Sequence, residues 1–527
     1  MTLEAGLEPV DPSTAERIGL TWLRAELAPG GAFGRRHDEL TPPYRPGEEA
    51  RAQAEIADVV ALAERLDADG VARLRAALRA VPEPGPIVAR ARAGDALADV
   101  DFYELGRFVD ALGALRAAWD VAGGAPDRRP PALDGLRTLL APGREGSGFY
   151  LADAFAPPLR AARAALARAE ADAEARRETI AARVRAATGI DPAGEEFVVL
   201  RDVYDGPLPA GVLVVRETPT YRTAALQVLA PERDAALGAL GELEENARRA
   251  LAAQVTSEAG ALGAAADELG ALDRCLARVA LAQRWGGCVP ELRPGGVAFT
   301  EATFAPLASA LAARGRRYTP LSLELRGVAV VTGPNMGGKS AALATAGFVC
   351  ACAALGVPPP ARAAALPLLD TIGWIGGEGH EDRTRLLSSY AAEVVRARDA
   401  LLRASPRALI LVDEFARTTG PREGRALLVA FAEALRTRGA TALIATHFDG
   451  VAGAAGVAHL RIAGLHERAL GALSDDLEAA LDAINAAMDY RIVPAGEAAG
   501  ESDALALAEL LGLERALIER ARAVYES

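Results

Sequence analysis

The sequence predicts a multidomain protein: an α-helical amino-terminal part, an arm of two long helices around a small β-rich insertion, an α/β domain and a helical carboxy-terminal end. A chain of 527 residues is long enough for several cores, at ~100 to 200 residues per domain. Its 51% hydrophobic and 24% charged residues are typical of a folded globular protein and exclude a fibrous or mainly disordered one. Three apolar runs separated by helical stretches, at 327–333, 408–414 and 440–447, predict the buried parallel strands of the α/β domain.

Helical periodicity predicts the amino-terminal part. From about residue 48 to 150, helix-like apolar spacing recurs between Gly and Pro breaks. One stretch places six large apolar side chains on a single stripe, which predicts a core-facing helix: Phe102, Leu105, Phe108, Val109, Leu112 and Leu115.

Two long helical patterns with strand-like runs between them predict the arm. The first pattern is Ala-rich and charge-laced and covers 155–187, and the second covers 232–284. The runs at 197–204, 211–217 and 221–228 are separated by Gly and Pro, as short strands are. Long helices that bracket a small β-rich insertion indicate an arm projecting from a helical body.

The basic residues are almost all arginine. Of the 58 Lys and Arg residues, only Lys339 is Lys. Arg carries a broad planar fork, whereas Lys is a compact charge on a thin stem. A position that keeps Lys therefore indicates a narrow site that contacts phosphate.

This Lys lies in a phosphate-loop pattern. The order G-x-x-x-x-G-K-S follows a strand-like run and precedes a helix, the context that makes the pattern specific. Backbone N–H groups and the helix N-terminus would hold the phosphates, Lys339 would reach the β and γ phosphates, and Ser340 would ligate Mg²⁺. The sequence therefore predicts ATP and Mg²⁺ as cofactors, bound by Gly333, Pro334, Asn335, Met336, Gly337, Gly338, Lys339, Ser340 and the following Ala341.

Polar residues end the other two strands of the predicted sheet. Asp413 follows five apolar residues and is predicted to hold Mg²⁺, directly or through water. Glu414 is then placed to polarise the attacking water as general base. His447, at the end of the next strand, is predicted to sense the γ-phosphate by hydrogen bonding, although a lone His can equally have no catalytic part.

Three segments of the chain resemble a known family. The segments GPNMGGKS, LVDEFARTTGPREG and TALIATHF resemble the ATPase domain of MutS-type proteins, a dimeric branch of the ABC ATPases. The resemblance implies a homodimer that binds and hydrolyses ATP, with Lys339, Glu414 and His447 catalytic. The segment SSYAAEV (388–394) looks like the family's signature segment, whose Ser and Glu approach the ATP of the other subunit, so Ser388 would act in trans. Tyr318 stands where the family often stacks an aromatic ring on adenine, and a surface Tyr is the alternative.

The resemblance extends along most of the chain and departs from the family in places. It implies a short MutS-like protein that lacks the mismatch-recognition and connector domains. The residues after the Asp-Glu pair, among them Ala416 and Thr418, and Leu386 and Leu387 before the signature Ser, differ from the family pattern. The implied regions are a helical core and lever at 1–155, a clamp-like arm at 156–245, a returning core helix at 246–300, the P-loop ATPase at 301–470 and a helical dimerisation region at 471–527.

The net charge of the chain does not decide whether its partner is DNA or another protein. A net charge of -13 means that nucleic acid could be held only by a local basic patch. The predicted arm helix offers one, with seven Arg against four acidic residues between Arg160 and Arg185. We favour a DNA-associated, repair-type ATPase whose clamp moves on DNA without reading mismatches itself. The alternatives are an ATP-driven remodelling factor for a client protein, such as a reactivase for a cobalamin-dependent aminomutase, and a slow ATPase that serves as a scaffold.

The lack of a recognisable secretory signal and the small number of cysteines predict a cytoplasmic protein. The first residues have no basic start followed by an apolar run, so we expect no secretory signal. Four Cys in a chain of this length cannot form a disulfide framework. The apolar stretch 341–357 approaches the length of a membrane span, but it begins at the phosphate loop and stops at a Pro run. A buried helix is therefore predicted there, and no membrane contact.

Overall fold

A computed structural model describes most of the chain as two compact units. The described residues are 10–146, 148–194, 196–334, 338–376, 389–417, 419–465, 488–497, 508 and 513–525. The first unit comprises Met1–Arg79, Leu115–Pro130 and Glu268–Ser527, and the second comprises Ala80–Ala114 and Pro131–Asp267. Helices α7 (Asp99–Val121) and α11 (Ala259–Trp285) each run from one unit into the other.

A six-stranded sheet, counted among the described strands, forms the centre of the first unit. Its order is β11-β12-β13-β9-β14-β15, and all neighbours are parallel except β14 and β15. The predicted parallel sheet is thus confirmed. The strands are β9 (Val328–Thr332), β11 (Thr371–Gly376), β12 (Ala408–Asp413), β13 (Thr441–Ala445), β14 (Ala458–Leu465) and β15 (Met488–Pro494).

Helices cover both faces of this sheet, which explains why its strands are almost wholly apolar. Alternate residues of each strand point to opposite faces. In β12, Leu409 and Leu411 pack with α13 (Lys339–Ala354), whereas Ile410 and Val412 pack with helices of the other face. The helices of that other face are α14 (Ser389–Arg403), α15 (Pro421–Thr437) and α16 (Val451–Ala455).

Helix α13 is buried along almost its whole length, as predicted for the apolar stretch that follows the phosphate loop. None of the helices in the described part of the chain is both long and apolar enough to cross a membrane. The chain's four cysteines all lie in that part and are free.

Further elements of the first unit surround the sheet. Among the described strands, four form a second sheet of order β6-β10-β7-β8. The remaining elements are α1 (Pro12–Arg17), α2 (Leu20–Leu27), α3 (Ala32–Leu40), α4 (Glu49–Arg65), α5 (Ala68–Arg79), β6 (Glu291–Leu292), β7 (Val297–Ala302), α12 (Ala305–Ala312), β8 (Leu321–Leu325), β10 (Ala363–Leu366) and α19 (Arg515–Tyr525). The helical prediction for the carboxy-terminal end, 471–527, is wrong at Met488–Pro494, because this segment pairs with β14 and forms strand β15 of the central sheet. It is confirmed in the described helix α19. Leucines 507, 510 and 511 of the predicted end lie outside the described residues.

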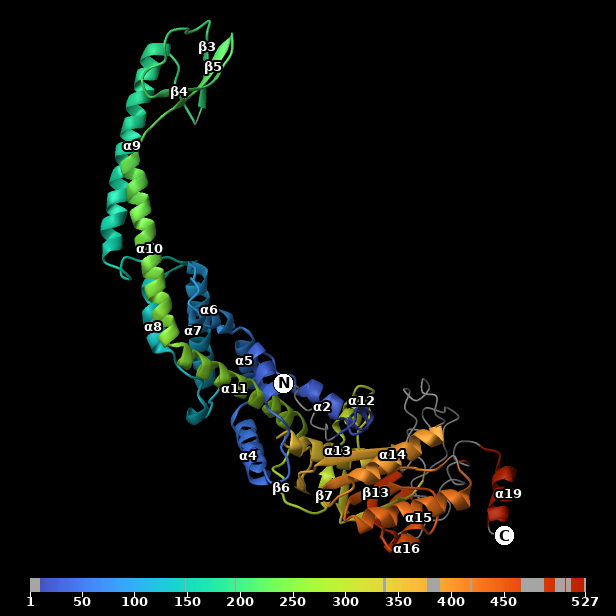
Figure 1. Ribbon diagram of the computed structural model, residues 1–527. Helices are drawn as coiled ribbons and strands as arrows, with labels where there is room; N and C mark the ends of the chain where they lie inside the picture. Colours follow the sequence, from blue (N-terminus) through green and yellow to red (C-terminus); the bar gives the residue numbers. More distant parts are fainter. Residues whose placement is uncertain are drawn as a thin grey trace. The chain divides into compact units, whose positions relative to one another are not determined.

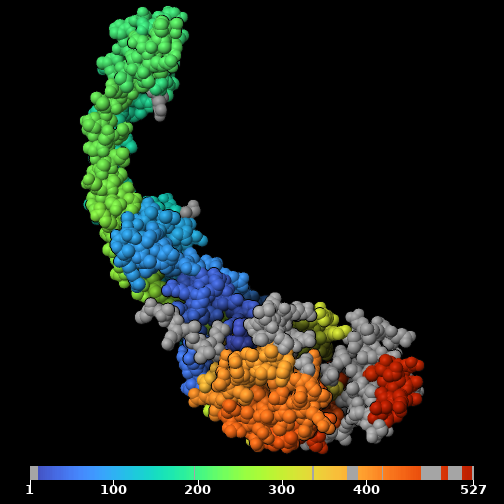
Figure 2. Space-filling view, turned by 45° about the vertical axis from the view of Figure 1, so that its right-hand side comes forward, coloured from blue at the N-terminus to red at the C-terminus, as the bar shows by residue number. Residues whose placement is uncertain are grey.

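The second unit contains the two long helices and the small sheet between them in sequence. Figure 1 shows α9 (Pro158–Thr188) and α10 (Pro231–Ser257) side by side, where Leu159 and Leu240 share a buried cluster. An antiparallel sheet of order β3-β5-β4 lies at one end of this helix pair (Figures 1 and 2). Its strands are β3 (Glu196–Leu200), β4 (Val212–Glu217) and β5 (Tyr221–Leu226), and the unit's other elements are α6 (Gly85–Ala93), part of α7, α8 (Asp134–Leu140), β1 (Arg144–Glu145) and β2 (Gly148–Phe149).

The stripe predicted on α7 is confirmed, since all six of its side chains are buried. The single helix predicted over 232–284 is wrong, because α10 ends at Ser257 and α11 begins at Ala259. Hydroxyl side chains bond to backbone carbonyls beside the break. Thr256 Oγ1 donates to the backbone carbonyls of Ala252 and Ala91, and Ser257 Oγ donates to the carbonyl of Gln254. Such side-chain bonds compete with the helical backbone pattern.

Candidate nucleotide site

Three adjacent parallel strands bring the predicted motifs to one edge of the central sheet. Strand β13 lies between β12 and β9, and Ala445 pairs with both Asp413 and Val331. Because carboxyl ends of parallel strands meet at the same edge, the segments after these strands lie next to one another. The phosphate loop, the Asp-Glu pair and the Thr-His pair are therefore gathered at one place.

The described ends of the phosphate loop require glycine. Gly333 and Gly338 have φ angles of 146° and 84°, which residues other than glycine rarely adopt. A Cβ on Gly338 would also lie 3.2 Å from Tyr490 Cδ1. The middle of the loop, with Asn335, Met336 and Gly337, lies outside the described residues.

Lys339 is the first residue of α13 and is buried with its charge. Its ammonium donates to the backbone carbonyls of Gly333, at 2.8 Å, and Pro334, at 3.1 Å. Burial lowers the pKa of Lys339, whereas the nearby carboxylates of Glu414 and Asp413 raise it. A cation is thus held at the helix N-terminus by the backbone of the loop that precedes it.

Ser340 and Asp413 join the phosphate-loop helix to the neighbouring strand end. The Ser340 hydroxyl donates to Asp413 Oδ1 at 3.0 Å. Burial raises the pKa of Asp413, and Glu414 adds to this effect, whereas the bond from Ser340 opposes it. A hydroxyl and a carboxylate at this distance are oxygen donors of the kind that Mg²⁺ prefers. The residues present therefore fit a magnesium ion.

Glu414 sits in a strained backbone conformation. Its φ angle is 57°, and that of Ala416 two residues later is 62°. Such angles cost non-glycine residues about 1 to 3 kcal/mol each and persist only where the surroundings fix them. Here the Glu414 N–H donates to the Ala445 carbonyl at 3.0 Å, and Ala416 is fully buried. The carboxylate of Glu414 lies 3.5 Å from Arg417 Nη1.

Thr446 and His447 follow β13 beside these groups. The Thr446 N–H donates to the Val331 carbonyl, and its buried hydroxyl oxygen accepts from the Phe448 N–H at 3.0 Å. His447 is exposed, with its ring centroid 4.3 Å from that of Phe448. The structure thus places His447 at the sheet edge that carries Asp413 and the phosphate loop.

Two aromatic side chains lie near the start of α13. The Tyr318 hydroxyl shares a 3.2 Å hydrogen bond with Thr345 Oγ1, which donates to the Ala341 carbonyl in the first turn of the helix. Tyr318 is partly buried, and this burial raises the pKa of its hydroxyl. Tyr490, on β15, was missed as a neighbour of the phosphate loop, since its approach to Gly338 depends on the pairing of β15 with β14.

The signature segment is described only in part. Ser388 lies outside the described residues. Glu393, on α14, accepts a hydrogen bond from the Ala416 N–H at 3.1 Å, so its carboxylate contacts the loop that follows the Asp-Glu pair of its own subunit. The sequence contains no local signal for this contact, because the two residues are brought together by the packing of α14.

Comparisons with known proteins agree with these motifs. Residues 329–527 match the family model for MutS domain V. The DNA mismatch repair protein MutS of Thermus thermophilus is 28% identical over 543 aligned residues, covering 99% of this chain and 60% of that protein. The endonuclease MutS2 of Anaeromyxobacter sp. is 31% identical over 298 residues, which are 54% of this chain and 34% of that protein.

A third relative matches over a shorter stretch. The DNA mismatch repair protein MutS of Granulibacter bethesdensis is 34% identical over 208 residues, which are 38% of this chain and 22% of that protein. The chain thus spans between about a fifth and three fifths of the length of these relatives. Residues 329–527 thus match MutS domain V, and similarity to a MutS protein extends along nearly all of the chain.

Proposed function

We propose that this chain is an ATP hydrolase of the MutS type. The observation that carries the proposal is the contact between Ser340 and Asp413, which joins a phosphate-loop helix to the acidic end of a neighbouring strand beside Lys339. A magnesium ion bound by Ser340 and Asp413 would neutralise charge on the β and γ phosphates. The relatives named above include DNA mismatch repair proteins, and the resemblance of the site's motifs to a MutS-type ATPase domain supports hydrolysis as the activity.

Each residue of the site has a proposed role. The backbone N–H groups of the loop, from Gly333 through Gly338 to Ala341, bind phosphate oxygens, and Asn335, Met336 and Gly337 complete the loop. Lys339 leaves its loop carbonyls to contact the β and γ phosphates. Glu414 accepts a proton from the attacking water, and His447 donates a hydrogen bond to the γ-phosphate. Tyr318 flanks the adenine.

We propose further that the protein works as a homodimer. Ser388 of each subunit would then complete the ATP site of its partner, as the resemblance of segment 388–394 to the family's signature implies. Closure of the two sites would act on the second unit through α7 and α11, which are continuous from one unit to the other.

The proposed partner is DNA, contacted through α9. The names of the relatives support DNA repair, and nothing comparable supports a client enzyme. Most arginines of α9 already hold carboxylates in the structure, but ion pairs this exposed contribute only ~0 to 1 kcal/mol each. Phosphate can therefore replace them. The pairs join Arg160 and Arg163 to Asp153, Arg163 to Glu244, Arg176 to Glu232, Arg177 to Glu174, and Arg185 to Glu178 and Asp191.

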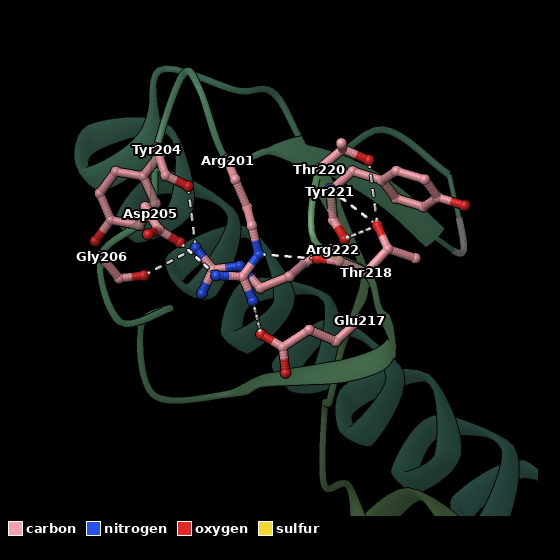
Figure 3. A network of polar contacts seen from close by, with 9 residues as sticks. All are labelled: Arg201, Tyr204, Asp205, Gly206, Glu217, Thr218, Thr220, Tyr221 and Arg222. Carbon is pink, nitrogen blue, oxygen red and sulfur yellow. Dashed lines mark hydrogen bonds and ion pairs between the residues drawn. The ribbon is translucent and has the colours of Figure 1, made fainter.

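Arginines of the small sheet have a different task. Figure 3 shows Arg201 and Arg222 close together between the loop at 204–206 and the strand ends. Arg222 is buried and donates to the carbonyls of Tyr204 and Gly206, both at 3.0 Å. Arg201 donates to the Thr218 carbonyl and is paired with Asp205 and Glu217. These guanidinium groups hold the sheet's own loops, so we assign DNA contact to α9.

Two experiments test the proposed function. Calorimetry with Mg²⁺ and ATP should show binding by the wild type, and Glu414→Gln should bind ATP but hydrolyse it at least 100-fold more slowly. Absence of ATP binding would remove the proposal. Normal hydrolysis by Glu414→Gln would remove Glu414 as the base.

DNA contact is tested by binding to duplex, junction and single-stranded DNA across salt concentrations. Contact of about three arginines of α9 with phosphates predicts a slope near -3 for log affinity against log salt, at about -0.9 per phosphate. Replacing both Arg160 and Arg176 with Ala should weaken binding about 10-fold, while Arg233→Ala, an exposed and ion-paired control on α10, should not. If the protein binds none of the three kinds of DNA at low salt, DNA is not its partner, and a client protein becomes the favoured alternative.

A further inference from the structure

The strongest unassigned contact at the site joins Glu393 to the loop that carries Glu414. Glu393 Oε2 accepts the Ala416 N–H at 3.1 Å. The Ala416 carbonyl is held as well, by the Thr419 N–H at 3.1 Å and the Thr419 hydroxyl at 2.8 Å. Ala416 is therefore fixed at both its donor and its acceptor.

We propose that Glu393 is a positioning residue for the hydrolysis suggested above, acting on Glu414 of its own subunit through the backbone of Ala416. This inference rests on the proposed function. It gives the Glu of segment 388–394 a role within one subunit, whereas the family resemblance implies an approach to the ATP of the other.

Backbone strain is the reason that the loop needs this anchor. Glu414 and Ala416 both have positive φ angles, which non-glycine residues leave readily when nothing holds them. The Ala445 carbonyl holds the Glu414 N–H from one side. On the other side, Glu393 holds the next strained residue, so the direction of the Glu414 side chain is fixed between two anchors.

The carboxylate suits this task better than a neutral acceptor. Glu393 is half-buried, and burial raises the pKa of its carboxyl, whereas the Ala416 N–H and the nearby guanidinium groups of Arg396 and Arg417 favour the charged form. A charged acceptor makes a stronger hydrogen bond to a backbone N–H than a neutral one. The ordinary alternative is that Glu393 only attaches α14 to the sheet.

Substitutions at Glu393 separate these two roles. Glu393→Ala removes the acceptor, and single-turnover ATP hydrolysis should slow at least 10-fold while ATP affinity stays within about 2-fold. Glu393→Gln keeps an oxygen that can accept the same bond and should restore the rate to within about 3-fold of the wild type. Asp399→Ala, an exposed position on the same helix paired with Arg398, is the matched control and should hydrolyse normally.

A second variant gives an independent measurement. Thr419→Val removes the hydroxyl that donates to the Ala416 carbonyl and should slow hydrolysis with ATP affinity retained. Equal loss of ATP affinity and rate in Glu393→Ala, or no change in rate, would overturn the inference. If Glu393→Ala does not fold, the hydrolysis rates of Glu393→Gln and Thr419→Val test the inference instead.

The double variant shows whether Glu393 acts through Glu414. If it does, Glu393→Ala should cause no further loss of rate in a Glu414→Gln background. An additional 10-fold loss there would contradict the inference, because Glu393 would then act on another group. The proposed function is judged separately, by ATP binding and by Glu414→Gln alone, so either can fail without the other.

Discussion

The hydroxyl of Ser340 and the carboxylate of Asp413 lie 3.0 Å apart although 73 residues separate them in the sequence. Ser340 lies in the first turn of the helix that leaves the phosphate loop, and Asp413 ends a strand two positions away in the sheet from the strand before that loop. The hydroxyl gives the buried carboxylate a hydrogen-bond donor. We propose that a magnesium ion, when bound, takes oxygens from both.

Ser340→Ala should therefore weaken ATP binding mainly when magnesium is present. The variant loses one oxygen donor for the ion, but no group that contacts phosphate directly. We expect the ratio of ATP affinities measured with Mg²⁺ and with a chelator to fall at least 5-fold. Ser340→Thr keeps the hydroxyl and should keep the ratio. An unchanged ratio in Ser340→Ala would contradict a metal role for Ser340.

Asp413→Asn should stabilise the nucleotide-free protein at neutral pH. Burial raises the pKa of Asp413 above its value in the unfolded chain, so the charged carboxylate costs the folded state free energy at pH 7. Asn avoids this cost and still accepts the Ser340 hydroxyl. The melting temperature should rise by a few degrees at pH 7, and the difference should shrink as pH falls through the raised pKa of Asp413. A constant difference across pH would show that charge is not the cause.

Lys339→Arg should fail almost as completely as Lys339→Ala. The ammonium is buried between the carbonyls of Gly333 and Pro334 and the first turn of α13, where a planar guanidinium does not fit. Titration calorimetry should show a loss of ATP affinity of at least 100-fold in both variants. Near-normal binding by Lys339→Arg would mean that charge alone is required and that the site is not narrow.

Arg278→Leu should destabilise the first unit more than the loss of a surface ion pair. Arg278 is buried on α11, forms an ion pair with Glu55 and donates to the Leu355 carbonyl at the end of α13. Leaving the Leu355 carbonyl and Glu55 without their buried donor costs about 1 to 3 kcal/mol. Arg284→Ala on the same helix breaks a pair with Glu26 and should cost less than about 1 kcal/mol, because both side chains are accessible to water. Denaturant unfolding measures both losses of unfolding free energy. Equal losses in the two variants would show that Arg278 does not anchor the first unit more strongly than Arg284 does.

The central sheet and the phosphate loop were predictable because their signals are local. A strand buried on both faces must be apolar throughout, and β12 is apolar up to its final Asp413. The strained ends of the phosphate loop accept only glycine, and Gly333 and Gly338 stand there. The seven arginines of α9 were equally visible, but most of their carboxylate partners were not, since Asp153, Asp191, Glu232 and Glu244 lie outside the helix.

The sequence by itself determined three central strands of the parallel sheet, the residues of the phosphate loop and the acids that end β12, because each depends on the chemistry of neighbouring residues. Only the tertiary structure decided that Ser340 meets Asp413, that Glu393 holds Ala416, and that the helical pattern beyond α10 breaks at Glu258, where Thr256 reaches Ala91. Hydrogen bonds between residues far apart in the chain form only where the packing of whole elements brings donor and acceptor within about 3 Å, and no local pattern encodes that distance.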